Sequence, residues 1–144
     1  MKYKTSVVAA AIAASGLAFA GTAIAAAASH LPATHTQGEV RYLSGGIGKS
    51  EAAAMKHAAR RYPLQLEFLL KAKPKEEYLA DIKVQIKDAH DRLVLDAIAG
   101  GPFLLAKMPA GKYKVSADRD GKVVHRQIEI AASGHQRVVF EWLS

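Results

Sequence analysis

Alternating apolar and polar positions dominate the chain from Pro63 to its end. Because successive side chains of a strand point to opposite faces, each alternating stretch predicts a strand with one buried face. Between these stretches lie turn signals, of which Asp120-Gly121 predicts a tight hairpin. The pattern predicts a mainly β fold, a seven-stranded antiparallel β-sandwich over residues 63–144. The seven stretches are 64–70, 80–86, 93–95, 103–105, 113–117, 124–130 and 138–142.

A period near 3.6 replaces the alternation over residues 50–62, which predicts one short α-helix preceding the sandwich. Ser50 is placed to cap this helix, and Glu51 falls in its first turn. Pro63 is expected to end the helix, because the residue before a proline avoids the α conformation. A narrow apolar stripe at helical spacing is formed by Ala52, Met55, Ala59 and Tyr62.

The two segments before the helix lack both patterns. Residues 1–25 begin with two lysines, continue as an alanine-rich apolar run and end in small-residue motifs. This order is typical of a bacterial secretory signal peptide, and a membrane anchor is the poorer interpretation because the run is interrupted by serine and glycine. Residues 26–49 are small, polar and glycine-bearing, which predicts a flexible arm or linker. Val40, Tyr42 and Leu43 could add a short strand.

The predicted signal peptide limits the compartment in which the protein can act. It places the mature protein in the periplasm or outside the cell, with no transmembrane segment after cleavage and no nucleic acid as partner. Of 20 basic and 13 acidic residues, Lys2 and Lys4 lie in the leader, so 18 basic residues remain and the net charge is +5. A modest positive charge suits contact with anionic surfaces, although simple solubility explains it as well. The chain has no cysteine, which excludes disulfides, thiol chemistry and cysteine-based zinc sites.

A set of turn and strand residues in the second half forms a known pattern. Its members are Ile82-x-Val84-x-Ile86-x-Asp88, Gly101-Pro102-Phe103-x-Leu105, Met108-Pro109-Ala110-Gly111-Lys112-Tyr113-x-Val115-x-Ala117 and Gly121. With these residues, the stretch 78–130 resembles the carboxypeptidase regulatory-like domain, a transthyretin-like (prealbumin-like) β-sandwich. Met108 replaces the usual leucine, and the turn from Asp88 to Asp91 lacks the usual glycine. The resemblance implies a non-catalytic module that docks or binds, although fold analogy alone assigns no activity.

Other motifs give little support for catalysis or for a cofactor. The stretch Gly45-Gly46-Ile47-Gly48-Lys49-Ser50 compares with a phosphate-binding loop, but Leu43 and Ser44 stand where glycine is required. A flexible segment that leads into the helix explains these residues, and binding of an anion at the helix N-terminus stays an alternative. The six histidines form no close pair on one helix face, so no metal site is predicted. A small hydrolase stays an alternative, because the transthyretin-like fold hosts the hydroxyisourate hydrolases, whose Tyr-Arg-Gly-Ser tail has no counterpart here.

The best functional candidate is a basic cluster on the predicted helix. We expect a non-catalytic exported accessory protein of the bacterial envelope that acts as a protein-interaction module. An alternative is a binder of anionic envelope ligands, lipid or glycan, through the basic helix, and a merely solvated helix face is the plainer explanation. The cluster consists of Lys49, Lys56, His57, Arg60 and Arg61.

Overall fold

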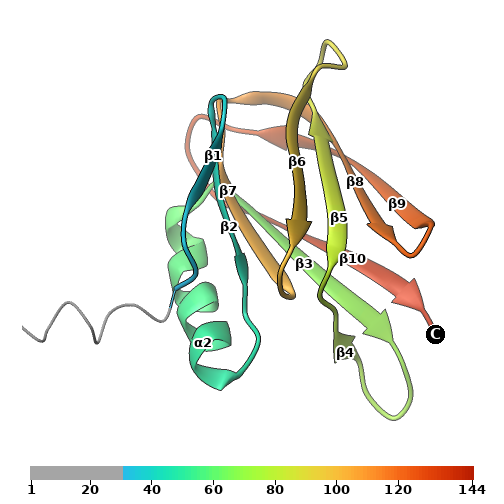
Figure 1. Cartoon of the computed structure of the whole chain (residues 1–144). Helices are drawn as coiled ribbons and strands as arrows, with labels where there is room; N and C mark the ends of the chain where they lie inside the picture. Colours follow the sequence, from blue (N-terminus) through green and yellow to red (C-terminus); the bar gives the residue numbers. More distant parts are fainter. Residues whose placement is uncertain (1–30) are drawn as a thin grey trace, which may run out of the picture.

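The computed structural model describes residues 31–144, so the predicted signal peptide and the start of the predicted arm lie outside the described residues. Two β-sheets face each other, and one helical segment lies against the outer side of one sheet (Figure 1). Sheet A has six strands in the order β1 (His35–Gln37), β2 (Val40–Gly45), β7 (Phe103–Lys107), β3 (Leu64–Lys71) and β10 (Gln136–Leu143), with β4 (Glu77–Tyr78) against the end of β3. Sheet B has the order β6 (Leu93–Ala99), β5 (Ile82–Lys87), β8 (Gly111–Arg119) and β9 (Lys122–Ile130). The helical segment comprises α2 (Lys49–Ala58) and the 3₁₀ turn η1 (Ala59–Arg61).

The main core fills the space between the two sheets. Strand β5 shows the expected alternation, with Ile82, Val84 and Ile86 buried and Lys83 and Lys87 exposed. Large apolar side chains face them from sheet A, among them Leu66, Phe68, Leu104, Phe140 and Trp142. Burial of this kind supplies the main stabilisation of a domain without disulfides, at about 1.5–3 kcal/mol for each large side chain.

A second, smaller core forms between the helix and sheet A. Met55, Ala58 and Ala59 are buried against Leu43, Phe103 and Leu105, which point away from the sheet interface. Ala52 and Tyr62 pack at the edge of this group, so the apolar stripe predicted from helical spacing is confirmed. Strand β3 is buried on both faces, since Gln65 and Glu67 on its outer side are contacted by His135 and Arg137, and its burial therefore does not alternate as that of β5 does.

All seven predicted strands are present, but the predicted architecture is wrong in three respects. Residues 31–144 form ten strands and not seven. β1 and β4 were too short to carry a pattern, whereas β2 is the short strand that Val40, Tyr42 and Leu43 could add. The helix does not precede the sheets but lies between β2 and β3, and residues predicted as an arm form two strands of sheet A. The fold is not wholly antiparallel, since β10 runs parallel to β3, from Gln136 beside Leu64 to Leu143 beside Lys71.

The turn into the helix depends on glycines rather than on the serine cap predicted from sequence. Gly48, with a φ of 86°, occupies the N-cap position, and Ser50 makes no capping hydrogen bond. A side chain at Gly101 would collide with the backbone of Gly45, so these two segments approach as only glycine allows. Pro63 does end the helix, because Tyr62 already has an extended conformation.

Candidate functional site

The structure places the predicted basic cluster on one exposed surface, which we call the cationic face. Helical geometry brings Lys49, Lys56 and Arg60 onto one side of the helix, and His57 and Arg61 lie next to them. All five side chains are exposed, because the buried residues Met55, Ala58 and Ala59 occupy the opposite side. The five residues predicted from sequence are therefore all exposed on the side of the helix that faces away from sheet A.

No acidic side chain of the helix balances this cationic face. Its single acid, Glu51, is turned toward the preceding loop, where its Oε1 accepts a hydrogen bond of 2.8 Å from the backbone N–H of Gly46. The four ion pairs within residues 31–144 all lie elsewhere. Glu51 also supplies the negative charge that a helix N-terminus favours, so the chain's own carboxylate occupies the position that the sequence left open for an anion.

Lys56 is the only member of the cationic face with aromatic neighbours among those described. Its Nζ lies 5.9 Å from the ring centroids of both Tyr78 and Phe103. The two rings lie 5.5 Å apart, and Tyr78 comes from the short strand β4, which the sequence pattern did not reveal. At the other end of the helix, Lys107 Nζ lies 5.0 Å above the ring of Tyr62. Tyr78 and Lys107 thus border the cationic face, and the sequence analysis missed both.

The outer face of sheet B carries lysines too, but acidic side chains accompany them. Lys114 Nζ forms an ion pair of 3.1 Å with Asp91. Lys83 lies directly opposite Asp118 in the β5–β8 ladder, and directly opposite residues share a face of the sheet. In the same way Lys112 lies opposite Glu129 on β9. Three lysines of this face therefore have an acidic neighbour, whereas Lys87 lies opposite Lys114.

A polar cluster with two buried members, Gln65 and Glu67, lies on the outer face of sheet A. Glu67 is only 3% exposed, and its Oε2 accepts a hydrogen bond of 2.7 Å from Arg137 Nε and lies 2.6 Å from Nη2 of the same guanidinium. His135 Nδ1 lies 2.7 Å from the carbonyl oxygen of Tyr62, and its Nε2 lies 3.1 Å from Gln65 Oε1. These contacts join the end of η1, β3 and the start of β10. They attach the end of the helical segment to the sheet. The alternating pattern could not predict these contacts, because a glutamate in such a pattern is assigned to the exposed face.

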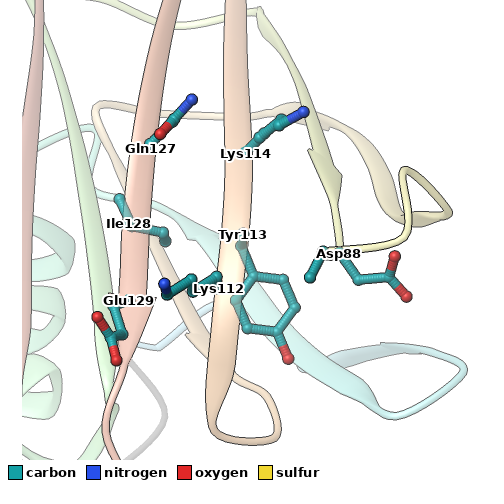
Figure 2. Close-up of a pocket in the computed structure, with 8 residues that line it drawn as sticks. Asp88, Lys112, Tyr113, Lys114, Gln127, Ile128 and Glu129 are labelled. Atoms are coloured by element: carbon teal, nitrogen blue, oxygen red, sulfur yellow. The ribbon is translucent and has the colours of Figure 1, made fainter.

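A hollow of about 400 Å³ lies where the β5–β6 turn meets β8 and β9 (Figure 2). An adjoining hollow of about 690 Å³ shares Asp88 and Tyr113 with it. The Tyr113 hydroxyl donates a hydrogen bond of 2.6 Å to the carbonyl oxygen of Pro109. Burial, together with the charges of Asp88 and Glu39, raises the pKa of Tyr113. The hydroxyl is thus a neutral donor committed to the backbone, and we assign it a structural role.

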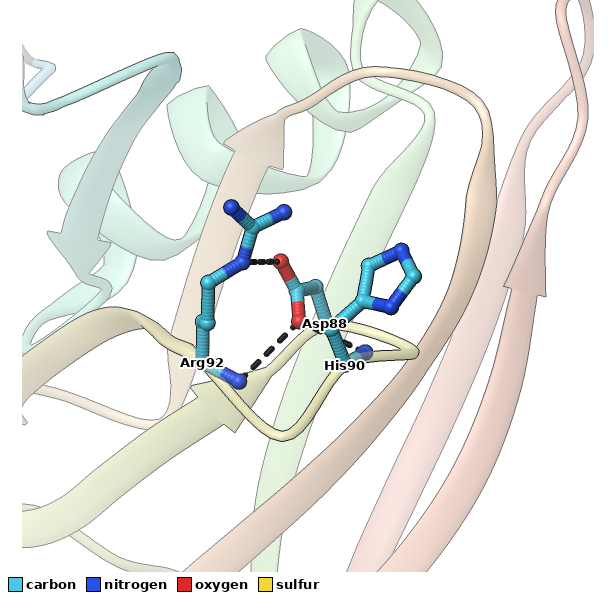
Figure 3. Close-up of polar contacts among 3 residues, drawn as sticks. All are labelled: Asp88, His90 and Arg92. Carbon is cyan, nitrogen blue, oxygen red and sulfur yellow. Dashed lines mark hydrogen bonds and ion pairs between the residues drawn. The ribbon is translucent and has the colours of Figure 1, made fainter.

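Asp88 organises the turn beside this hollow (Figure 3). Its Oδ1 accepts hydrogen bonds from the backbone N–H groups of His90 and Arg92 at 2.8 and 3.0 Å, and its Oδ2 accepts one from Arg92 Nε at 3.0 Å. Partial desolvation raises the pKa of Asp88, but these hydrogen bonds and the Arg92 charge outweigh it, so the pKa lies below its ordinary value. Asp91 ends the turn with a φ of 59°, a left-handed conformation that is uncommon for residues other than glycine but tolerated by aspartate.

The described residues bring no candidate metal site together. Within residues 31–144, no three histidine, aspartate or glutamate side chains gather closely enough to hold an ion. The helical segment in this part of the chain is also too short and too polar to span a bilayer.

No known protein family matches this sequence, and no curated protein matches it either. What is established is a mainly β, two-sheet domain with one short helix.

Proposed function

We propose that this protein is an exported, non-catalytic accessory protein of the bacterial envelope that binds an anionic partner through its cationic face. One observation carries this proposal: five exposed basic residues lie along one helix, and its single acid is turned away to Gly46. Uncompensated charge on a surface attracts an opposite partner over several ångströms and raises the association rate. The predicted leader would deliver such a protein to membranes and glycans that are anionic.

The resemblance to a carboxypeptidase regulatory-like domain of transthyretin-like fold belongs to the same proposal. Its motif residues take the roles expected of a β-sandwich module, since Met108 and Tyr113 are buried in the main core and Phe103 is buried under the helix. Asp120 and Gly121 form the predicted hairpin turn, with φ angles of 50° and 87°. A module of this kind would present the cationic face without catalysing a reaction.

The proposal is tested with two variants of equal charge. The double variant Lys49→Gln/Arg60→Gln removes two charges from the cationic face, and Lys83→Gln/Lys112→Gln removes two from the outer face of sheet B. We expect the first variant to elute from immobilised heparin at clearly lower salt than the wild type, and the second to elute close to the wild type, because its lysines are already compensated. Equal shifts for both variants would show that only net charge matters, and the proposal would be wrong.

A second candidate function is protein interaction by strand addition at β9. This strand forms one edge of sheet B, and seven of its nine residues lie at least partly exposed. The opposite edge is occupied, because the Gln37 side chain donates to the carbonyl oxygen of Asp96 and accepts from its N–H, both at 2.9 Å. Site-specific crosslinking from Gln127 on β9 should capture one extended segment of a defined partner, and crosslinking from Gln85 in the middle of the sheet should not. Capture from both positions alike would contradict strand addition.

A further inference from the structure

We infer that the anionic partner is the surface of a lipid bilayer, and that Tyr78 and Ile47 enter its interface beside the cations. This inference rests on the proposed function and names the partner of the same cationic face. It comes from the two exposed apolar side chains that border the helix.

Tyr78 lies on the helix side of sheet A. Its ring contacts Phe103, which is buried under the helix, and Lys56 Nζ lies 5.9 Å from its centroid, yet Tyr78 itself is 54% exposed. The ring is thus held between the sheet and a cation while much of its surface faces outward. A tyrosine in this setting offers an apolar ring and a polar hydroxyl, the combination that is enriched at membrane interfaces.

Ile47 lies in the loop two residues before α2 and is 62% exposed. The neighbouring Gly46 passes directly beside the ring of Phe103, where a side chain would collide with it. Phe103 therefore links both features: it touches Tyr78 on one side and the Ile47 loop on the other. Two exposed apolar side chains consequently flank the cationic face around a single buried ring.

The form of the helix suits a flat partner. The segment from Lys49 to Arg61 has 13 residues and is roughly 20 Å long, and it lies lengthwise against sheet A (Figure 1). Its cations can therefore meet one plane of lipid phosphates together. An exposed aliphatic side chain such as Ile47 adds little to the binding of a hydrated polyanionic glycan, whereas a bilayer interface favours both isoleucine and tyrosine. Cations bordered by apolar side chains thus favour lipid.

The test uses vesicles of phosphatidylglycerol mixed with phosphatidylcholine, and vesicles of phosphatidylcholine alone. We expect binding to the first and little to the second. The Lys49→Gln/Arg60→Gln variant should partition about 30-fold less strongly, because each basic residue near an anionic membrane contributes about a fivefold gain. Ile47→Ser should weaken partitioning about fivefold. Ile98→Ser is the matched control, since Ile98 is 63% exposed but lies on sheet B, and it should leave partitioning unchanged.

Insertion is checked with Ile47→Trp, whose fluorescence should shift to the blue on binding the anionic vesicles. Trp142, the single native tryptophan, is buried and gives a constant background. Heparin binding without vesicle binding would overturn the lipid inference and leave the proposed function standing. Vesicle binding that is insensitive to Ile47→Ser and gives no blue shift would overturn insertion. If the wild-type protein bound neither heparin nor anionic vesicles, both the inference and the proposed function would be wrong.

Discussion

The outer faces of the two sheets differ in their contact with solvent and in how their charges are arranged. The outer face of sheet B is left to solvent, so its strands alternate regularly and each of Lys83, Lys112 and Lys114 has an acidic neighbour. On the outer face of sheet A the helix covers β2 and β7, and β3 beside them is buried on both sides and contains the buried glutamate Glu67. Where the helix covers the sheet, the helix itself presents the surface to solvent. No acidic side chain of the helix balances the positive charge of that surface.

Three lysines on sheet B have neighbours of opposite charge, whereas the basic residues of the helix are available to bind a partner. On sheet B, Lys114 pairs with Asp91, and Lys83 and Lys112 stand opposite acidic residues, while charged side chains also discourage edge-to-edge aggregation. On the helix, Glu51 is used to hold the Gly46 loop, which leaves the basic residues without a partner on their own element.

The largest effect is expected where the segment leading to the helix passes the β6–β7 connection. Gly101→Ala should lower the free energy of unfolding by about 3 kcal/mol, because the new methyl group would meet the backbone of Gly45, which cannot move aside as a side chain can. Gly100→Ala is the control, since only Ser44 Oγ lies near, at 3.9 Å. Urea denaturation of the two variants gives the comparison, and similar unfolding midpoints would contradict the close approach.

The helix itself can be loosened from sheet A by Met55→Ala. Met55 is fully buried between α2 and the sheet, so its truncation should cost about 2.5 kcal/mol in transfer free energy and cavity formation. Ala53→Ser, on the exposed side of the same helix, should cost no more than about 0.5 kcal/mol. Thermal unfolding followed by circular dichroism measures both. An unchanged midpoint for Met55→Ala would mean that the helix does not depend on this contact.

The buried charge on sheet A gives an asymmetric prediction. Arg137→Met should cost about 2 kcal/mol, because it leaves the Glu67 carboxylate buried without its cation; the half-exposed position of Arg137 keeps the cost below that of a fully buried pair. The control is Lys71→Met, which breaks an ion pair with Glu141 on the same two strands. Both members of that pair are partly exposed, so its loss should cost less than about 1 kcal/mol. Equal costs in urea denaturation would refute the distinction.

The smallest effect is expected at the Asp88 turn, and it should depend on pH. Because the folded pKa of Asp88 lies below its ordinary value of 3.8, its charge stabilises the fold above that pH, and the contribution is lost as the pH falls through the folded pKa. Asp88→Asn keeps an oxygen acceptor but removes the charge. Its unfolding midpoint should therefore lie below that of the wild type at pH 6 and approach it near pH 3. A constant difference at both pH values would assign the effect to geometry instead of charge.

Local patterns predicted local elements well. Alternation located the seven main strands, the dipeptide Asp120-Gly121 located the hairpin, and helical spacing identified which side of the helix is buried. The basic residues of the candidate site were also predicted, because exposed charge on an amphipathic helix follows from the same spacing. These features depend on residues that are neighbours in the chain.

Long-range features could not be predicted in the same way. Nothing in the sequence of β10 indicates that it runs parallel to β3, because sheet order depends on how distant segments pack. Strands β1 and β4 have three and two residues, too few for a period to be recognised. The contribution of Tyr78 to the cationic face was missed for this reason, since only its pairing with Leu69 brings it beside Lys56.

The parallel pairing of β3 with β10 has a consequence for how the protein reaches its fold. Gln136 pairs with Leu64, 72 positions earlier, and the register continues to Leu143 beside Lys71. One side of β3 therefore stays unpaired until a segment far later in the sequence docks against it, and pairings so distant in sequence slow folding. The joining of β3 and β10 is thus expected to be a late step in the folding of sheet A.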